Sequence, residues 1–127
     1  MPSSSEGSDR APVVVRSERE GPLWVIALRG DFDPEFIDLV EEATTVALVA
    51  FDGPLVFDLR EVGFCDSSLL NHLIRTKNRR PLALVGANGS VRRLLIVTGL
   101  DPHLPCHPDL DAACDALVPG PLPCEQA

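Results

Sequence analysis

Asp66, Ser67 and Ser68 form a short polar run in which a side chain could cap a helix or act as a nucleophile. A nucleophilic serine needs a neighbouring general base and donors for the developing oxyanion. Ser68 has no G-x-S-x-G context, and the sequence identifies no histidine partner for it. An aspartate followed by two serines before an apolar run is typical of a helix start. The residue types therefore favour a helix cap over a hydrolase.

A second group of side chains, near the C-terminus, could ligate a metal ion. It consists of His103, Cys106, His107 and Cys114. The spacing His-x-x-Cys-His is not that of a standard zinc site, and prolines at 105 and 108 constrain the chain between the ligands. We therefore predict no metal site and no cofactor.

The cysteines indicate a reducing compartment. The four of them, at positions 65, 106, 114 and 124, show no CxxC spacing, and no apolar stretch follows a basic region at the N-terminus. Cysteines of a protein without an export signal are expected to be reduced thiols. Cys65 lies in an apolar run, which favours a small buried hydrophobe over a redox group. These features predict a cytoplasmic protein.

The charge of the chain bears on its partners. The formal net charge is −8, and an acidic domain repels phosphate backbones and anionic lipid. No segment approaches the roughly 20 apolar residues that span a bilayer. The basic cluster at 75, 77, 79 and 80 is interpreted as a solvated helix end. We therefore expect no binding to nucleic acid or membranes, and a basic partner surface fits better.

Strand patterns alternate with helix patterns along the chain. Apolar and β-branched runs at 13–16, 23–29, 55–59 and 82–85 predict strands, and 104–106 predicts a short extended piece. Asp33-Pro34-Glu35 starts the first expected helix, with Asp33 as its cap, and Asp66-Ser67-Ser68 starts the second. Two further helices are expected over 88–97 and 109–117.

This alternation predicts an α/β domain with a mixed, mostly parallel sheet of four or five strands and about four helices. The strand at 55–59 should not lie at a free edge. The domain should span residues 13–118, between a disordered tail at 1–12 and a flexible proline-rich tail at 119–127. The side chains expected to be buried are Trp24, Ile26, Val56, Phe57, Leu73 and Leu84.

Four motifs in register resemble the STAS domain family, of the anti-sigma factor antagonist type. Residues 56–70, VFDLREVGFCDSSLL, resemble the family signature that ends in Asp-Ser-Ser/Thr-Gly-Leu. Residues 28–33, LRGDFD, look like its L-x-G-x-x-D motif, and residues 82–85 look like its third core strand. Residues 91–100, VRRLLIVTGL, look like the segment that ends in Thr-Gly-Leu.

The resemblance implies a partner switch and not an enzyme. In this family the unphosphorylated antagonist binds an anti-sigma factor that is also a serine kinase of the GHKL ATPase type, and the sigma factor is thereby freed. Phosphorylation of the second hydroxyl residue of the signature ends the complex, and a PP2C-type phosphatase resets it. That position falls on Ser68, with Ser67 as the alternative acceptor. The domain itself is expected to be a monomer or a weak dimer.

The same resemblance implies a partner-binding surface around the signature. The family usually has glycine where Leu69 stands, so we expect Leu69 to be partly exposed in a docking patch. The alternative function is a STAS adaptor or scaffold that is not phosphorylated and binds another protein or a small anionic ligand. The expected partner-binding residues are Asp31, Asp33, Asp66, Ser67, Ser68, Leu69 and His72.

Overall fold

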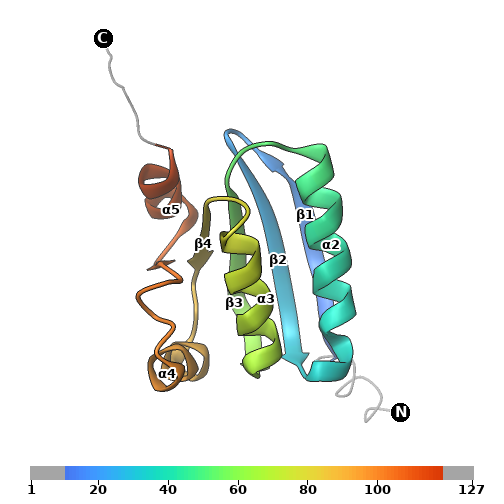
Figure 1. The fold of residues 1–127 in the computed structure, drawn as a ribbon, viewed down its shortest axis with the longest axis vertical. Helices are drawn as coiled ribbons and strands as arrows, with labels where there is room; N and C mark the ends of the chain where they lie inside the picture. The colour runs from blue at the N-terminus through green and yellow to red at the C-terminus, as the bar shows by residue number, and fades with distance from the viewer. Residues whose placement is uncertain (1–10, 119–127) are drawn as a thin grey trace.

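Strands and helices alternate along residues 11–118, the part of the chain that the structure, a computed structural model, describes (Figure 1). The strands are β1 (Val13–Glu20), β2 (Leu23–Phe32), β3 (Leu55–Cys65), β4 (Leu82–Val85) and β5 (Cys106–His107). The helices are the 3-10 turn η1 (Pro34–Phe36), α2 (Ile37–Ala50), α3 (Ser67–Lys77), α4 (Gly89–Thr98) and α5 (Leu110–Leu117). None of these helices is long and apolar enough to cross a membrane. The predicted tails lie almost wholly outside the described residues.

The five strands form one mixed sheet in the order β1-β2-β3-β4-β5. β1 pairs with β2 antiparallel, and every other neighbouring pair is parallel. β3 lies at the centre of the sheet, as the apolar run at 55–59 predicts. The structure therefore confirms the predicted single α/β domain with a mostly parallel sheet.

β2 and β3 are both longer than the sequence predicts. The expected strands end at 29 and 59, whereas pairing continues to Phe32 and Cys65. Register shifts between Ala27 and Arg29, and between Gly30 and Asp31, let the ladder pass through residues that are typical of strand ends. The extension carries both strands to the same edge of the sheet.

The sheet has a core on each face. Ile26, Phe57 and Leu84 belong to the larger core, which α2, α3 and α4 cover. Val56, on the other face, packs with Ala113 of α5 in a smaller core. Of the side chains predicted to be buried, Ile26, Val56, Phe57, Leu73 and Leu84 are 0% exposed.

Trp24 is the exception, because it is only partly buried. It packs on the rim of the larger core, with its ring centroid 6.0 Å from that of Phe51. Its indole N–H donates to Ser17 Oγ at 3.0 Å. A polar N–H that needs a partner keeps this ring at the sheet margin.

Side-chain caps start three of the helices. Asp66, Asn88 and Asp109 each accept a hydrogen bond from a backbone N–H in the first turn of α3, α4 and α5. The prediction that Asp33 caps the first helix is wrong, since its side chain makes no cap hydrogen bond. The chain instead enters α2 through the 3-10 turn that begins at Pro34.

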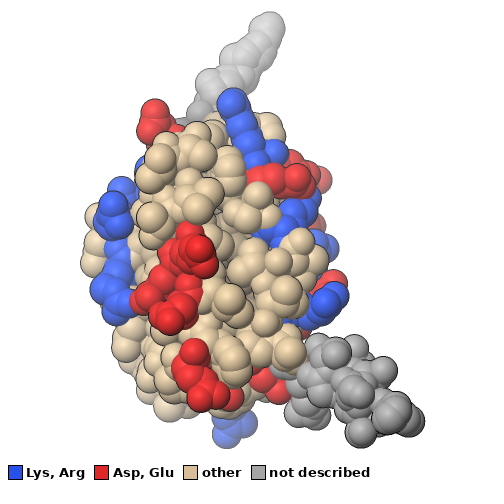
Figure 2. All heavy atoms as spheres, turned by 90° about the vertical axis from the view of Figure 1, so that its right-hand side faces the viewer, with Lys and Arg blue, Asp and Glu red and all other residues tan. Residues whose placement is uncertain are grey.

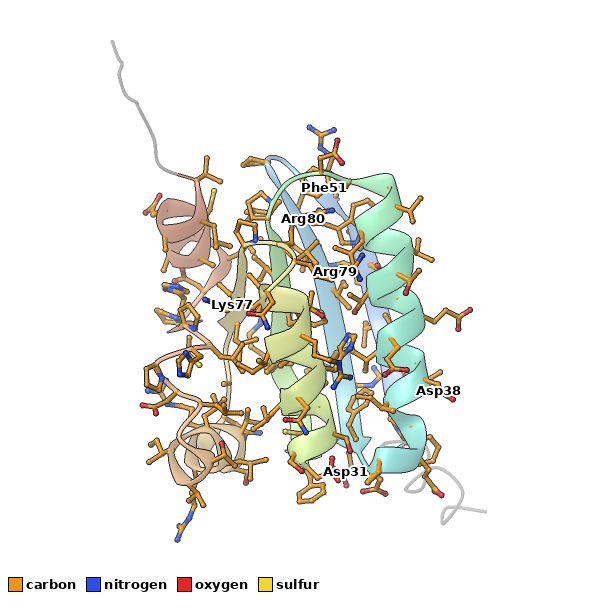
Figure 3. All side chains as sticks on the ribbon, viewed as in Figure 1. Asp31, Asp38, Phe51, Lys77, Arg79 and Arg80 are labelled. Carbon is orange, nitrogen blue, oxygen red and sulfur yellow. The ribbon has the colours of Figure 1, made fainter. Side chains whose placement is uncertain are left out.

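Arg80 ties the end of α2 to the loop that follows it. Its guanidinium donates to the carbonyl oxygens of Phe51 at 2.6 Å, Gly53 at 2.9 Å and Leu48 at 3.2 Å (Figure 3). Two of these carbonyls belong to the last turn of α2 and its C-cap, where a cation also favours the helix dipole. The prediction of a solvated helix end is therefore wrong for Arg80.

We expect Arg80→Ala to lower the free energy of unfolding by about 2–3 kcal/mol, because it removes three charge-assisted hydrogen bonds. Arg79→Ala is the matched control, since Arg79 is exposed, and it should stay within about 0.5 kcal/mol of wild type. Urea denaturation followed by circular dichroism measures both. Equal losses in the two variants would contradict the assignment.

The start of helix α3 as candidate partner-binding site

Asp66, Ser67 and Ser68 form the start of α3. Asp66 has extended backbone angles, φ −113° and ψ −170°, and its carboxylate accepts from the backbone N–H of Ser68 at 2.9 Å. Ser67 is exposed and Ser68 is half-buried. The predicted helix start is confirmed, and the side-chain cap is Asp66 and neither serine. The serine hydroxyls are thus not needed to cap α3.

The carboxyl ends of β2 and β3 bring two further carboxylates to this edge. In the parallel ladder Asp31 pairs with Phe64, and Phe32 pairs with Cys65, which directly precedes Asp66. The Asp31 side chain lies over Gly63, where a Cβ would be 2.8 Å from Asp31 Oδ1. Figure 3 shows Asp31 at the end of β2, close to the start of α3. Asp33 follows two residues later and is exposed.

Phe64 is an exposed aromatic residue at the same edge, and it was not among the predicted partner-binding residues. It is 48% exposed, whereas its neighbour Cys65 is buried. The sequence predicts a strand only over 55–59, so Phe64 falls beyond its expected end, where an apolar side chain has no predicted direction. In the extended β3 strand Phe64 and Cys65 point to opposite faces. A large exposed aromatic side chain is typical of a protein contact.

Leu69 does not lie on the surface, so the expectation that it is partly exposed is wrong. It is 1% exposed and belongs to the larger core. As the third helical residue it turns inward, whereas Ser67 turns outward. Leu69 therefore contributes packing to the core and no contact surface.

His72 is also buried, so it does not contact a partner in this conformation, contrary to expectation. Its Nε2 lies 2.9 Å from Thr44 Oγ1 of α2. The Thr44 hydroxyl donates its only proton to the Val40 carbonyl at 2.7 Å, so His72 Nε2 must be the donor to Thr44. His72 thus joins α3 to α2. Burial lowers its pKa, against the opposing effect of Glu41, while Arg75 lowers it further.

A lowered pKa of His72 makes stability depend on pH. The folded protein binds a proton on His72 less readily than the unfolded chain does. The contribution of His72 to the free energy of unfolding is therefore fully present above about pH 6.5 and is lost as the pH falls below that value. We expect His72→Gln, which keeps an N–H donor, to flatten the loss of stability below about pH 6.5. Thermal unfolding across this range measures it. The control His103→Gln alters an exposed histidine and should follow wild type. Identical pH profiles for all three proteins would contradict this account.

The remaining chemical candidates have structural roles or no assembled site. Cys65 is 4% exposed, and burial, with a smaller contribution from Asp66, raises its pKa to about 12. That environment suits a small buried hydrophobe. Within residues 11–118, no group of three or more His, Cys, Asp or Glu side chains could hold a metal ion. His103, Cys106, His107 and Cys114 therefore form no metal centre in this structure.

Known proteins share this fold and sequence pattern. Residues 15–105 match the family described as "Mlab, STAS domain". An anti-sigma factor antagonist from Mycobacterium paratuberculosis superposes with a TM-score of 0.77 and 26% identity, over 85% of this chain and 95% of that one. An anti-sigma-factor antagonist (STAS) domain protein from Planctomyces limnophilus superposes with a TM-score of 0.62 and 25% identity, over 80% of this chain and 96% of that one.

More distant structures show the fold alone. The anti-sigma factor antagonist SpoIIAA in its unphosphorylated form gives a TM-score of 0.58 with 20% identity, over 84% of this chain and 93% of that one. The phosphorylated form of SpoIIAA, a cell fate determinant of Bacillus, gives a TM-score of 0.54 with 18% identity, over 84% of this chain and 96% of that one. No curated protein matches the sequence. The family match spans β2, β3 and α3, which build the edge described above, and the chain belongs to the STAS domain family.

Proposed function

We propose that this protein is an anti-sigma factor antagonist, a binding protein and not an enzyme, that docks through the sheet edge at the start of α3. The observation that supports this most is the Asp66-Ser67-Ser68 helix start, in which Ser67 is exposed and Ser68 half-buried, flanked by Asp31 and Asp33 in a STAS domain. Two similar solved proteins, at 25–26% identity, are described as antagonists of anti-sigma factors. The expected partner is an anti-sigma factor that is a serine kinase of the GHKL ATPase type.

The proposed switch is phosphorylation of Ser68, with Ser67 as the alternative acceptor. The acceptor hydroxyl attacks the γ-phosphorus of ATP, the bond to the β-phosphate oxygen breaks, and the hydroxyl proton is lost. The helix start favours a negative charge, so the fold tolerates the product. Leu69, which replaces the family's glycine, is in the core and presents no side chain to the kinase.

A phosphate here would act on the complex and not on the fold. The Ser68 amide already donates to the Asp66 carboxylate, so a phosphate with about −1.5 to −2 charge would adjoin an existing negative charge. In a packed interface that added charge is desolvated and unpaired. A loss of about 2.7 kcal/mol weakens binding 100-fold. A PP2C-type phosphatase would restore the hydroxyl.

Phosphopeptide mass spectrometry tests this function directly. The full chain is incubated with an ATPase-type anti-sigma factor recovered from the native host, in the presence of ATP and Mg²⁺. We expect one phosphate, on Ser68, and release of the partner as it accumulates. A phosphate on Ser67 would move the switch by one residue. No phosphate on either serine would contradict the switch.

A STAS adaptor that is not phosphorylated is the second candidate. It is favoured by the description of the matching family, which names a STAS domain and no anti-sigma factor. In that case the same edge binds a different protein or a small anionic ligand. The two functions separate in one experiment, because an adaptor keeps its partner in the presence of ATP.

A further inference from the structure

Helix α2, with the η1 turn before it, carries two apolar stripes: an inner one that is buried in the core, and an outer one of which only Ala43 packs against the core. The inner stripe includes Val40, Thr44 and Ala47, all buried. The outer stripe runs through Phe36, Leu39, Ala43, Val46 and Ala50, at alternating steps of three and four residues. That spacing is the seam by which one helix packs against another. The outer stripe is therefore a helix-packing surface without a helix on it in residues 11–118.

The large side chains of the outer stripe are open to solvent. Phe36 is 36% exposed, Leu39 39% and Val46 55%. Two open hollows of about 580 and 460 Å³ lie beside this stripe, and both have Pro12 and Leu39 in their walls. Val13 and Val14 of β1 line the smaller hollow. We call the two adjoining hollows together the α2–β1 groove.

Carboxylates border the α2–β1 groove. Asp38 and Glu42 line it from α2 and Glu35 from η1, and Asp31 and Asp33 line its end. No Lys or Arg is among the described residues that line either hollow. Figure 2 shows Asp and Glu in a column on this side of the molecule, beside an uncharged surface. Asp38 points outward from α2 in Figure 3.

We propose that the α2–β1 groove binds a basic amphipathic helix of a partner protein. The three-four spacing selects a helix, because only a helix presents apolar side chains in that repeat. The bordering carboxylates select Lys and Arg on the partner's flanks. The site goes beyond the proposed function, since it lies along α2 and does not include the α3 serines. Its end shares Asp31 and Asp33 with the edge at the start of α3.

Two other occupants fit this groove less well. A second copy of the chain would bring the same carboxylates against each other, on a protein whose net charge is already −8. Residues 1–10, MPSSSEGSDR, are mostly polar and supply one large apolar side chain, Met1. That segment cannot cover an apolar stripe of four turns.

Fluorescence anisotropy with a labelled synthetic helix tests the proposal. The probe is an amphipathic peptide of leucine, alanine and lysine, and its twin carries glutamate in place of every lysine. We expect the full chain to bind the basic peptide and not the acidic one. Both the pair Leu39→Ser with Val46→Ser and the pair Glu35→Lys with Glu42→Lys should weaken binding about tenfold or more.

Two matched pairs on other helices control for hydrophobicity and charge. Ile96→Ser with Val97→Ser removes exposed apolar side chains from α4, and Asp111→Lys with Asp115→Lys reverses charge on α5. Both pairs, and Ser68→Asp, should bind the basic peptide as wild type does. Circular dichroism verifies that each variant is folded.

Several outcomes would overturn the proposal. They are absence of binding, equal binding of the acidic peptide, and equal weakening by the control pairs. A dimer in sedimentation that Leu39→Ser with Val46→Ser abolishes would assign the groove to a second copy. Peptide binding that appears only after removal of residues 1–10 would assign it to the N-terminal segment. None of these outcomes depends on phosphorylation of Ser68, so the proposed function is tested separately.

Discussion

Ser68→Asp is expected to weaken binding to the anti-sigma factor about tenfold, and phosphorylated wild type to bind about 100-fold more weakly than the unmodified protein. Aspartate adds one charge at the position where phosphate adds nearly two, so its effect is partial. Ser68→Ala should bind like wild type. It should also keep its stability within about 0.5 kcal/mol, because the Asp66 carboxylate and not the Ser68 hydroxyl caps α3. Isothermal titration calorimetry gives all the affinities.

Ser90→Asp is the matched control for this substitution. Ser90 is the second helical residue of α4, after the Asn88 cap, as Ser68 is the second of α3 after Asp66. An aspartate at either position interacts favourably with the dipole of its helix, and at Ser68 it also adjoins the Asp66 carboxylate. Only Ser68→Asp should lower the affinity. Equal affinities for the two aspartate variants would show that the α3 start lies outside the interface.

Leu69→Gly is expected to lower the free energy of unfolding by about 3–5 kcal/mol. Leu69 is 1% exposed, and truncation of a buried leucine costs about 2–5 kcal/mol through lost burial and the cavity left behind. Glycine in a helix adds up to about 1 kcal/mol. The total is a large part of the stability of an ordinary domain. Restoring the family's residue at this position should therefore damage the fold before it alters partner binding.

Leu69→Met provides the comparison, since it conserves volume and should cost less than about 1.5 kcal/mol. Urea denaturation of the three proteins gives the free energies. A stable Leu69→Gly variant with altered affinity for the partner would show that Leu69 is a contact residue after all, and that the core assignment fails.

Much of the fold follows from local signals in the sequence. The strands, the three side-chain caps and the stop of α4 at Gly99 (φ 76°) each depend on a few neighbouring residues. The start of α3 at Asp66-Ser67-Ser68 was predictable for the same reason. Alternation of strand and helix patterns then sufficed for the fold class.

The errors concern contacts between distant parts of the chain. Arg80 caps α2 from 29 and 32 residues away, and nothing in its own neighbourhood indicates this. His72 faces inward because Thr44 of α2 lies opposite, and Leu69 because the larger core lies beneath the first turn of α3. Phe64 points outward because β3 continues beyond residue 59, and this extension depends on the register shifts in the β2–β3 ladder. Side-chain direction of this kind is fixed by packing and not by residue type.

The strand order has a consequence for how the domain forms during translation. Neighbours in the sheet are neighbours in the chain, from β1 through β5. Each strand that leaves the ribosome can therefore pair with a strand that has already been synthesised. No strand has to stay unpaired until a much later segment of the chain is made. Unpaired strand edges are the aggregation hazard of a growing chain. The strand order allows the sheet to be extended by one strand at a time, so that at each stage the strand that still lacks its later partner is the one synthesised last.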